Sequence, residues 1–316
     1  MKDITAVQTN ITKTRSARRA VLRWIPTALL LLTIVACWTV VVQGGRTGII
    51  GWYLVQMLAP LVGLGVGLSV AVYAVWKRRR SLPIWLNLGL ALVALWPLGW
   101  LFGVGQIAYP SSITATTPSV AVRLPADVPL QVGWGGDSVA VNYHAAYPDQ
   151  RWAYDLLVAP SMLGSATLED YGCWGVEVVA PAAGEVALAQ DGLPDEVPGR
   201  LSNNVLAPTG NHVVLKLPTG TYLVIAHLKR DSVVVVVGDQ VREGQVIGRC
   251  GNSGTTSEPH IHIHHQRQHP ATAGGFAEGL PLYFRDHDGI PMPAGGIRVV
   301  DGRTVPQGAL VQHIGR

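Results

Sequence analysis

Three long apolar runs occupy most of the first third of the chain, at residues 25–43, 52–76 and 82–107, and none contains an acidic or basic side chain. A helix needs about 20 apolar residues to cross a bilayer, so each run can form a membrane span. Four arginines precede the first run, as in a signal peptide, but two further runs follow it closely. The sequence therefore predicts a three-helix transmembrane anchor over residues 25–109.

Basic residues flank these runs unevenly. The arm at residues 1–24 is basic and four basic residues at 77–80 follow the second run, whereas only Arg46 lies between the first two runs. Lysine and arginine flanks stay on the cytoplasmic side of a membrane. We therefore expect a cytoplasmic N-terminus, a C-terminal domain on the outer side, and contact with the lipid bilayer through three spans. These flanks also explain much of the net charge of +4, so no nucleic-acid partner is expected.

The composition changes near residue 110. Beyond it, glycine, proline, aspartate and short valine-rich runs are typical of a β-domain. Eight segments have a strand pattern: 141–144, 152–158, 176–180, 184–189, 212–217, 222–227, 245–249 and 260–264. We expect an all-β outer domain, an antiparallel β-sandwich or barrel-like sheet. A linker and first strand take up residues 110–140, the main domain 141–268, and a C-terminal extension 269–316.

Weaker signals come from other segments of the outer domain. Residues 191–208 and 269–279 lack a strand pattern and predict surface loops, which either frame a groove or are plain insertions. The valine run at 233–237 predicts a strand-like segment in the core. Cys173 and Cys250 can form a disulfide on an oxidising exterior, but the sequence does not decide whether they pair.

Histidines are densest at residues 259–265, which read Pro-His-Ile-His-Ile-His-His. Residues two apart on a strand share a face, so His260 and His262 project one way, with His264 as a further candidate for this face, while Ile261 and Ile263 project into the core. His264 and His265 lie at the end of this strand, where they are either exposed or line a groove. The strand therefore offers several imidazoles to one site.

Zinc suits such a site, because catalytic zinc usually has three histidine, aspartate or glutamate ligands and an open fourth position. One strand cannot supply all of them. His144, Asp155 and His227 are the candidate partners that precede it in the chain.

Five motifs occur in a characteristic order: Val-Val-Ala-Pro-Ala-Ala-Gly-Glu-Val at 178–186, Gly-Asn-His-Val-Val-Leu at 210–215, Ala-His-Leu at 226–228, Gly-Asn-Ser-Gly at 251–254 and Pro-His-Ile-His at 259–262. Their order resembles that of the lysostaphin-type zinc endopeptidases, also called the LytM or glycyl-glycine endopeptidase family. The resemblance covers about residues 141–264. It implies a β-fold of the duplicated-hybrid-motif type and a zinc metalloendopeptidase that hydrolyses peptide cross-links of bacterial peptidoglycan.

Residue by residue, the resemblance implies that His262 and Asp155 bind Zn²⁺. It also implies that His227 and His260 are a catalytic pair that does not bind the metal. Either imidazole can exchange a proton near neutral pH, and the motifs do not tell which one is the general base.

The chain departs from the family at the first metal ligand. The family has a histidine four residues before the aspartate, where this chain has Arg151. Arginine keeps its proton and cannot ligate zinc. His144, in an Asn-x-His segment eleven residues before Asp155, is the expected substitute.

The sequence thus predicts a zinc endopeptidase in the bacterial plasma membrane that acts on peptidoglycan peptides. Arg151 favours one alternative, an inactive family member that binds the cell wall or regulates another wall hydrolase. A transporter or sensor is a second alternative, but the apolar runs lack the charges that mark a transport pathway. A regulatory partner protein is not identified by the sequence.

Overall fold

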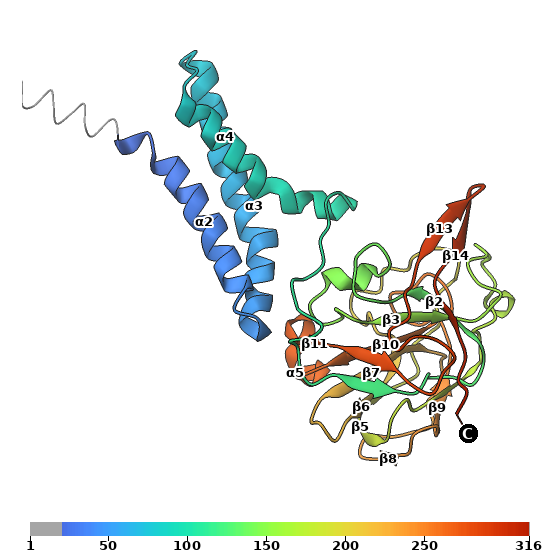
Figure 1. Cartoon of the computed structure of the whole chain (residues 1–316). Helices are drawn as coiled ribbons and strands as arrows, with labels where there is room; N and C mark the ends of the chain where they lie inside the picture. The colour runs from blue at the N-terminus through green and yellow to red at the C-terminus, as the bar shows by residue number, and fades with distance from the viewer. Residues whose placement is uncertain (1–20, 316) are drawn as a thin grey trace, which may run out of the picture. The chain divides into compact units, whose positions relative to one another are not determined.

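A computed structural model describes residues 21–315 of the chain. They form two compact units that divide between Gln106 and Ile107. The first unit is helical and the second is built mainly from β-strands (Figure 1). The predicted basic arm at 1–24 lies almost entirely outside the described residues.

The first unit contains α2 (Ile25–Val41), α3 (Gly45–Trp76), α4 (Leu82–Leu95) and a 3₁₀ helix, η1 (Trp96–Phe102). Two helical stretches are long and apolar enough to cross a membrane, Gly45–Trp76 and Leu82–Phe102, while α2 is shorter, with 17 residues. The structure therefore provides two candidate spans where the sequence predicted three. Arg46, expected in a loop, lies in the first turn of α3.

Small residues let these helices approach closely. A Cβ added at Gly63 of α3 would lie 2.8 Å from Cβ of Ala94 in α4. The Thr27 hydroxyl of α2 and the Asn87 side-chain oxygen of α4 form a buried hydrogen bond of 2.6 Å. Many large apolar side chains of these helices are exposed. Exposure of so much apolar surface to water would be unfavourable.

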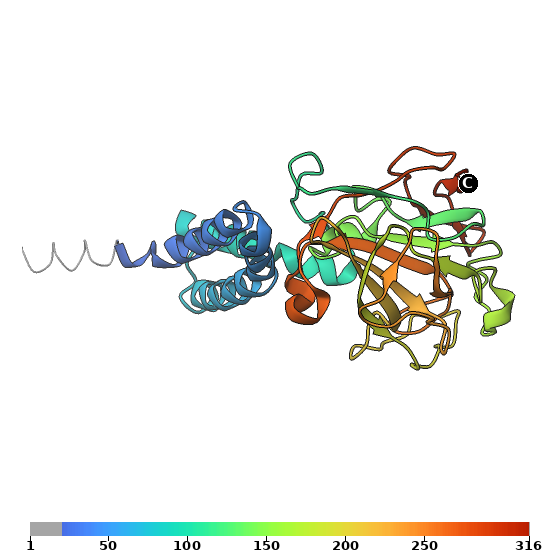
Figure 2. The same cartoon turned by 90° about the horizontal axis from the view of Figure 1, so that it is seen from below.

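The second unit is built around a nine-stranded sheet. Its strand order is β15-β2-β3-β10-β7-β6-β5-β8, with β11 also paired to β10, and every pair is antiparallel. The strands are β2 (Leu130–Trp134), β3 (Tyr154–Leu157), β5 (Gly184–Gln190), β6 (Asn211–Lys216), β7 (Tyr222–Leu228), β8 (Gln240–Val241), β10 (Ile261–Gln266), β11 (Gly279–Leu280) and β15 (Leu310–Val311). Figure 1 shows β10 between β3 and β7, and Figure 2 shows the same strands from below.

Three strand pairs lie outside this sheet. They are the parallel pair β1 (Val120–Val122) and β12 (Leu282–Phe284), the antiparallel pair β4 (Glu177–Val179) and β9 (Val246–Arg249), and the hairpin of β13 (Ile297–Val300) and β14 (Arg303–Pro306). The mostly β architecture of the outer domain is thus confirmed. The residues after 268 contribute β11, β12 and β15 to the sheets of the same unit.

Two predicted strands are wrong. Residues 141–144 do not form a strand, because a 3₁₀ turn, η2 (Tyr143–Ala146), begins there after Asn142, whose side chain accepts a hydrogen bond from the His144 N–H. The valine run at 233–237 forms no strand, although Val235 is buried in the core cluster and Val233 packs against that cluster. Val234, Val236 and Val237 are exposed. The N–H groups of Val233 and Val236 donate to the side chains of Asp191 and Asp239.

The two predicted surface loops have different structures. Residues 191–208 carry no strand or helix beyond an isolated bridge between Asp195 and Ser253. Residues 269–279 include a helical turn, α5 (Pro270–Ala273), followed by a 3₁₀ turn, η4 (Gly274–Phe276). The second stretch is therefore partly helical.

Alternation along β10 sorts its side chains between two environments. Ile261 and Ile263 are fully buried in the main core cluster, whereas His262 and His264 lie on the opposite face of the strand. Cys173 and Cys250 form the disulfide that the sequence left open, with 5.8 Å between their Cα atoms. This cross-link lies directly before the 251–254 turn, which borders the histidines.

Candidate metal centre

Neighbouring strands bring the predicted site residues together. Asp155 of β3 lies directly opposite His262 of β10, and His262 in turn lies opposite Ala226 of β7, the residue before His227. Antiparallel pairing places such residues within a few ångströms of each other. The strand order β3-β10-β7 therefore gathers Asp155 with His227 and His262, which lie 72 and 107 positions further along the chain.

Asp155 is the centre of this cluster. One carboxylate oxygen, Oδ2, lies 3.0 Å from Nε2 of His144, and the other, Oδ1, lies 2.8 Å from Nδ1 of His262. The three potential ligand atoms of these residues lie within 4.8 Å of one another, and all three residues are buried. The structure thus unites the three residues for which the sequence predicted metal binding.

His144 reaches Asp155 from the 3₁₀ turn η2. Asn142, which is fully buried, holds this turn, because its Oδ1 accepts from the His144 N–H and its Nδ2 donates to the carbonyl oxygens of Gly136 and Ala153. The Tyr143 hydroxyl donates to Asp155 Oδ2 at 3.2 Å. Asn142 and Tyr143 were missed by sequence reasoning, although the Asn-x-His spacing pointed to this segment.

Arg151 has a structural role. Its guanidinium group donates to the carbonyl oxygens of Tyr109 and Asp137, and it forms an ion pair of 2.8 Å with the Asp137 carboxylate. The side chain packs over the ring of Trp152 at 4.9 Å. These contacts engage all three nitrogens of the guanidinium group, so the residue at the position where the resemblance predicted a histidine serves a structural role.

The tautomer of His262 follows from a chain of hydrogen bonds along one face of β10. The Gln266 amide donates to the Gln268 carbonyl, so its Oε1 accepts from Nε2 of His264 at 2.9 Å. Nδ1 of His264 therefore carries no proton, and it accepts a hydrogen bond from the Nε2–H of His262, also at 2.9 Å. Nδ1 of neutral His262 therefore presents a lone pair to the Asp155 carboxylate.

Burial keeps these imidazoles neutral. It lowers the pKa of His262 below its usual value despite the adjacent Asp155, and it lowers the pKa of His264 well below that value. Burial alone would raise the pKa of Asp155, but His144 and His260 hold it well below its usual range. Asp155 and His262 therefore face each other as an ionised carboxylate and a neutral imidazole.

Such a set fits a divalent cation. A lone pair of His262 Nδ1 and a carboxylate oxygen face each other at 2.8 Å, an arrangement that a shared cation stabilises. Nδ1 of His144 is also buried and lacks a hydrogen-bond partner among the described residues. Two histidines and one carboxylate are a usual ligand set for catalytic zinc, with a fourth position left for water or substrate.

His227 and His260 lie beside this set with their tautomers determined by backbone carbonyls. Nδ1 of His227 donates to the Ser253 carbonyl and Nδ1 of His260 donates to the Glu258 carbonyl, both at 2.8 Å. The Nε2 atom of each ring can therefore accept or donate a proton. The two ring centroids are 4.8 Å apart, and His260 Nε2 lies 3.6 Å from Asp155 Oδ1.

The backbone of His227 is strained. Its φ of 61° lies in the left-handed region, which is uncommon for residues other than glycine. The register of β6 and β7 shifts next to it, between Asn211 and Val213. Strain of this kind is often stored where a side chain must take a particular direction, here toward His260.

The two catalytic candidates have opposite pKa shifts. Burial lowers the pKa of His227 well below its usual value, and the nearby His260 and His262 lower it further. Burial also lowers the pKa of His260, but Asp155 outweighs this effect and the net pKa is raised. The pair can therefore hold one neutral and one protonated imidazole at the same pH.

His264 and Gln266 were missed as site residues. Both are buried, so the expectation that His264 is exposed or lines a groove is wrong, and the same holds for His265, which bonds to the Thr221 hydroxyl on the other face of β10. The period of two along the strand made His264 a candidate for the face of His262, but it did not predict the hydrogen bond between them. Their contact depends on rotamers, which the sequence pattern does not specify.

We expect His264→Leu to weaken zinc binding by about 10- to 100-fold, because His262 would lose the acceptor that orients its ring. The measurement is zinc affinity by competition with a chelator of known affinity. His265→Leu is the matched control, since it removes a buried histidine from the opposite face of the same strand. Equal losses of zinc affinity in both variants would show that the effect is general destabilisation of β10.

Comparisons with known proteins agree with these observations. Residues 170–273 match the family model described as Peptidase family M23. This segment includes His227, His260 and His262, whereas His144 and Asp155 precede it. No protein with a curated description matches the sequence.

Three peptidases are among the solved structures to which the chain is similar. Lysostaphin from Staphylococcus simulans is 20% identical over 48% of this chain and 47% of its own, with a TM-score of 0.30. A putative peptidase M23 from Pseudomonas aeruginosa is 22% identical over 48% of each chain, with a TM-score of 0.29. A zinc-containing peptidase from Vibrio cholerae is 18% identical over 46% of this chain and 36% of its own, with a TM-score of 0.30. The chain spans less than half the length of these structures.

Proposed function

We propose that this chain, which contains a domain of peptidase family M23 at residues 170–273, is a membrane-anchored zinc endopeptidase that hydrolyses peptide bonds in peptidoglycan. The observation that carries the proposal is the cluster of His144, Asp155 and His262, whose ligand atoms lie within 4.8 Å of one another. A family domain alone is compatible with an inactive protein. A complete ligand set beside two oriented histidines favours an enzyme.

The proposed roles follow from the hydrogen bonds. His144, Asp155 and His262 would hold zinc, which when bound supplies a Lewis acid and lowers the pKa of a coordinated water toward 7. His227 and His260 each keep the Nδ1 proton on a carbonyl oxygen and leave Nε2 to accept or donate a proton. One can take a proton from the attacking water, while the other donates to the leaving amine or to the developing oxyanion.

The proposed location is the bacterial plasma membrane. The exposed apolar side chains of α2, α3 and α4 support an anchor, and we propose that all three helices cross the bilayer, with the 17-residue α2 extended by its flanking residues. The uneven basic flanks support a cytoplasmic N-terminus and an outer domain that faces the cell wall. Peptidoglycan is the polymer that a peptidase there would meet.

The described residues offer no observation that favours an inactive wall-binding or regulatory protein. Arg151 was the feature that suggested one, and it is engaged by Asp137 and Tyr109 while His144 lies at Asp155. A transporter or sensor is likewise not supported by any feature of the helices.

The full chain in detergent tests the proposal. We expect about one zinc per chain by elemental analysis, and release of soluble peptides from purified peptidoglycan that stops after treatment with 1,10-phenanthroline and returns with added zinc. A folded protein that holds no zinc and releases no peptides would refute the enzyme. Zinc binding without peptide release would point to another substrate or to the regulatory alternative.

A further inference from the structure

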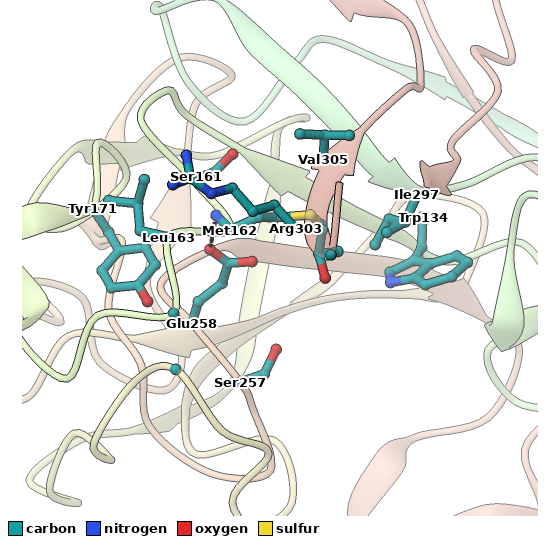
Figure 3. A pocket seen from close by; sticks show the side chains of 14 residues that line it. Trp134, Ser161, Met162, Leu163, Tyr171, Ser257, Glu258, Ile297, Arg303 and Val305 are labelled. Atoms are coloured by element: carbon teal, nitrogen blue, oxygen red, sulfur yellow. Dashed lines mark hydrogen bonds between the residues drawn. The ribbon is translucent and has the colours of Figure 1, made fainter. Parts of the chain in front are cut away.

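A large pocket adjoins the candidate metal centre. Its volume is about 930 Å³, within the range of small-molecule and peptide-side-chain sites (Figure 3). Trp134 forms one wall, and its ring packs edge-on against Tyr143, whose hydroxyl bonds to Asp155. A peptide bond held at the metal centre would therefore place a neighbouring residue of the substrate in this pocket.

The pocket combines segments that are far apart in the chain. Met162 and Leu163 come from the loop after β3, Gly199 from residues 191–208, and Val305 from β14 of the C-terminal hairpin. About half of its lining is apolar, and this part comes from the side chains of Trp134, Met162, Leu163, Tyr171, Ile297 and Val305. An aliphatic chain fits such walls through apolar burial.

Glu258 is the acidic group of this pocket. The residue is only 8% exposed, and Oε2 of its carboxylate accepts from the Met162 N–H at 2.6 Å (Figure 3). The backbone carbonyl oxygen of Glu258 accepts from Nδ1 of His260. Glu258 therefore contacts one of the two candidate catalytic histidines and also lines the pocket. Burial raises the pKa of Glu258, while the Met162 N–H and His260 oppose this rise.

The carboxylate of Glu258 forms no ion pair with any lysine or arginine of residues 21–315. Arg303 of β14 also lines the pocket, and Figure 3 shows its side chain extending toward Ser161, but it forms no ion pair with Glu258. His260 acts on the Glu258 carboxylate through its charge, but its Nε2 faces Asp155. A nearly buried carboxylate without an ion-pair partner is costly, and a cationic ligand group that bonds to it would lower this cost.

We propose that this pocket is a substrate subsite that binds a primary ammonium group beside the scissile bond, with Glu258 as its counter-ion. The proposal rests on the proposed peptidase function and specifies its substrate class, which is peptides that carry a free amine on an apolar stem. The stem contacts the apolar walls, and the ammonium group donates to the carboxylate oxygen that Met162 does not occupy. The amine is either an α-amine or a side-chain amine.

Binding to the wall polymer tests the subsite without any need for hydrolysis. The full chain in detergent, stripped of metal, is sedimented with purified peptidoglycan and with the same polymer after acetylation of its amines by acetic anhydride. We expect acetylation to weaken binding of the wild-type protein by about ten-fold or more, because a charge-assisted hydrogen bond is lost. Glu258→Gln should bind both polymers equally, since glutamine still accepts from the Met162 N–H but carries no charge.

Glu185→Gln is the matched control, because it removes one negative charge from an exposed position on β5. This variant should bind acetylated peptidoglycan more weakly than untreated peptidoglycan, as the wild type does. Equal binding of both polymers by the wild type would overturn the proposal, and so would discrimination that persists in Glu258→Gln. If Glu258→Gln fails to fold, the comparison of the two polymers with the wild-type protein still tests the proposal.

Two competitor peptides distinguish the source of the amine. The amide of Ala-Ala-Ala offers only an α-amine, and the amide of N-acetyl-Ala-Lys-Ala offers only a side-chain amine. Competition by one of them and not by its acetylated form identifies the source, whereas competition by neither contradicts the proposal. Peptide release by the metal-loaded protein is measured in parallel, so that a failure of the peptidase function is seen separately from a failure of the subsite.

Discussion

Replacement of His144 by alanine should lower zinc affinity by more than about 100-fold and abolish peptide release from peptidoglycan. The physical reason is the loss of one of three ligands, which leaves Asp155 and His262 unable to hold the ion alone. Elemental analysis after dialysis and the release of soluble peptides measure the two effects. This variant tests the shifted ligand directly, because the family position at Arg151 cannot replace it.

His269→Ala is the control for this prediction. His269 belongs to the same domain but caps the short helix α5, where its ring accepts from the Ala271 N–H. It should retain zinc and activity. If His144→Ala kept one zinc per chain and normal peptide release, His144 would not be a ligand, and the site would need another donor.

Replacement of His227 by asparagine should lower peptide release by about 10²- to 10⁴-fold while zinc content stays unchanged. Nε2 of His227 is left free by the bond of Nδ1 to the Ser253 carbonyl, so the variant removes a proton carrier and no metal ligand. Asparagine is chosen because it tolerates the left-handed backbone at φ 61° better than most residues. The measurement is the initial rate of peptide release at equal zinc loading.

His212→Asn is the matched control on the neighbouring strand β6. Its ring bonds to the Gly210 carbonyl, and the residue is not part of the cluster around Asp155. Its rate should stay close to that of the wild type. A His227→Asn protein that kept full activity would remove His227 from the mechanism, and one that lost zinc would make it a ligand.

Local patterns in the sequence predicted most of the outer strands. Period-two alternation placed Ile261 and Ile263 in the core and His262 on the other face, because successive side chains of a strand must point to opposite sides. The same reasoning failed at 141–144, where the Asn142 side chain caps a 3₁₀ turn. At 233–237 it placed Val235 in the core correctly but predicted a strand where aspartate side chains accept from the N–H groups of Val233 and Val236. In both places side-chain hydrogen bonds competed with strand pairing, and a valine-rich or alternating pattern does not reveal them.

The sequence by itself determined the apolar helices, the β-domain that follows them and the chemical character of the site, because these depend on residue type and short-range spacing. Only the tertiary structure decided that Arg151 turns to Asp137, that His264 and Gln266 orient His262, and that the hairpin of β13 and β14 lines a pocket with Glu258. Those arrangements arise from strand order and from rotamers chosen by packing between distant segments. Such contacts leave no periodic signal in one chain, since each depends on partners tens of residues away.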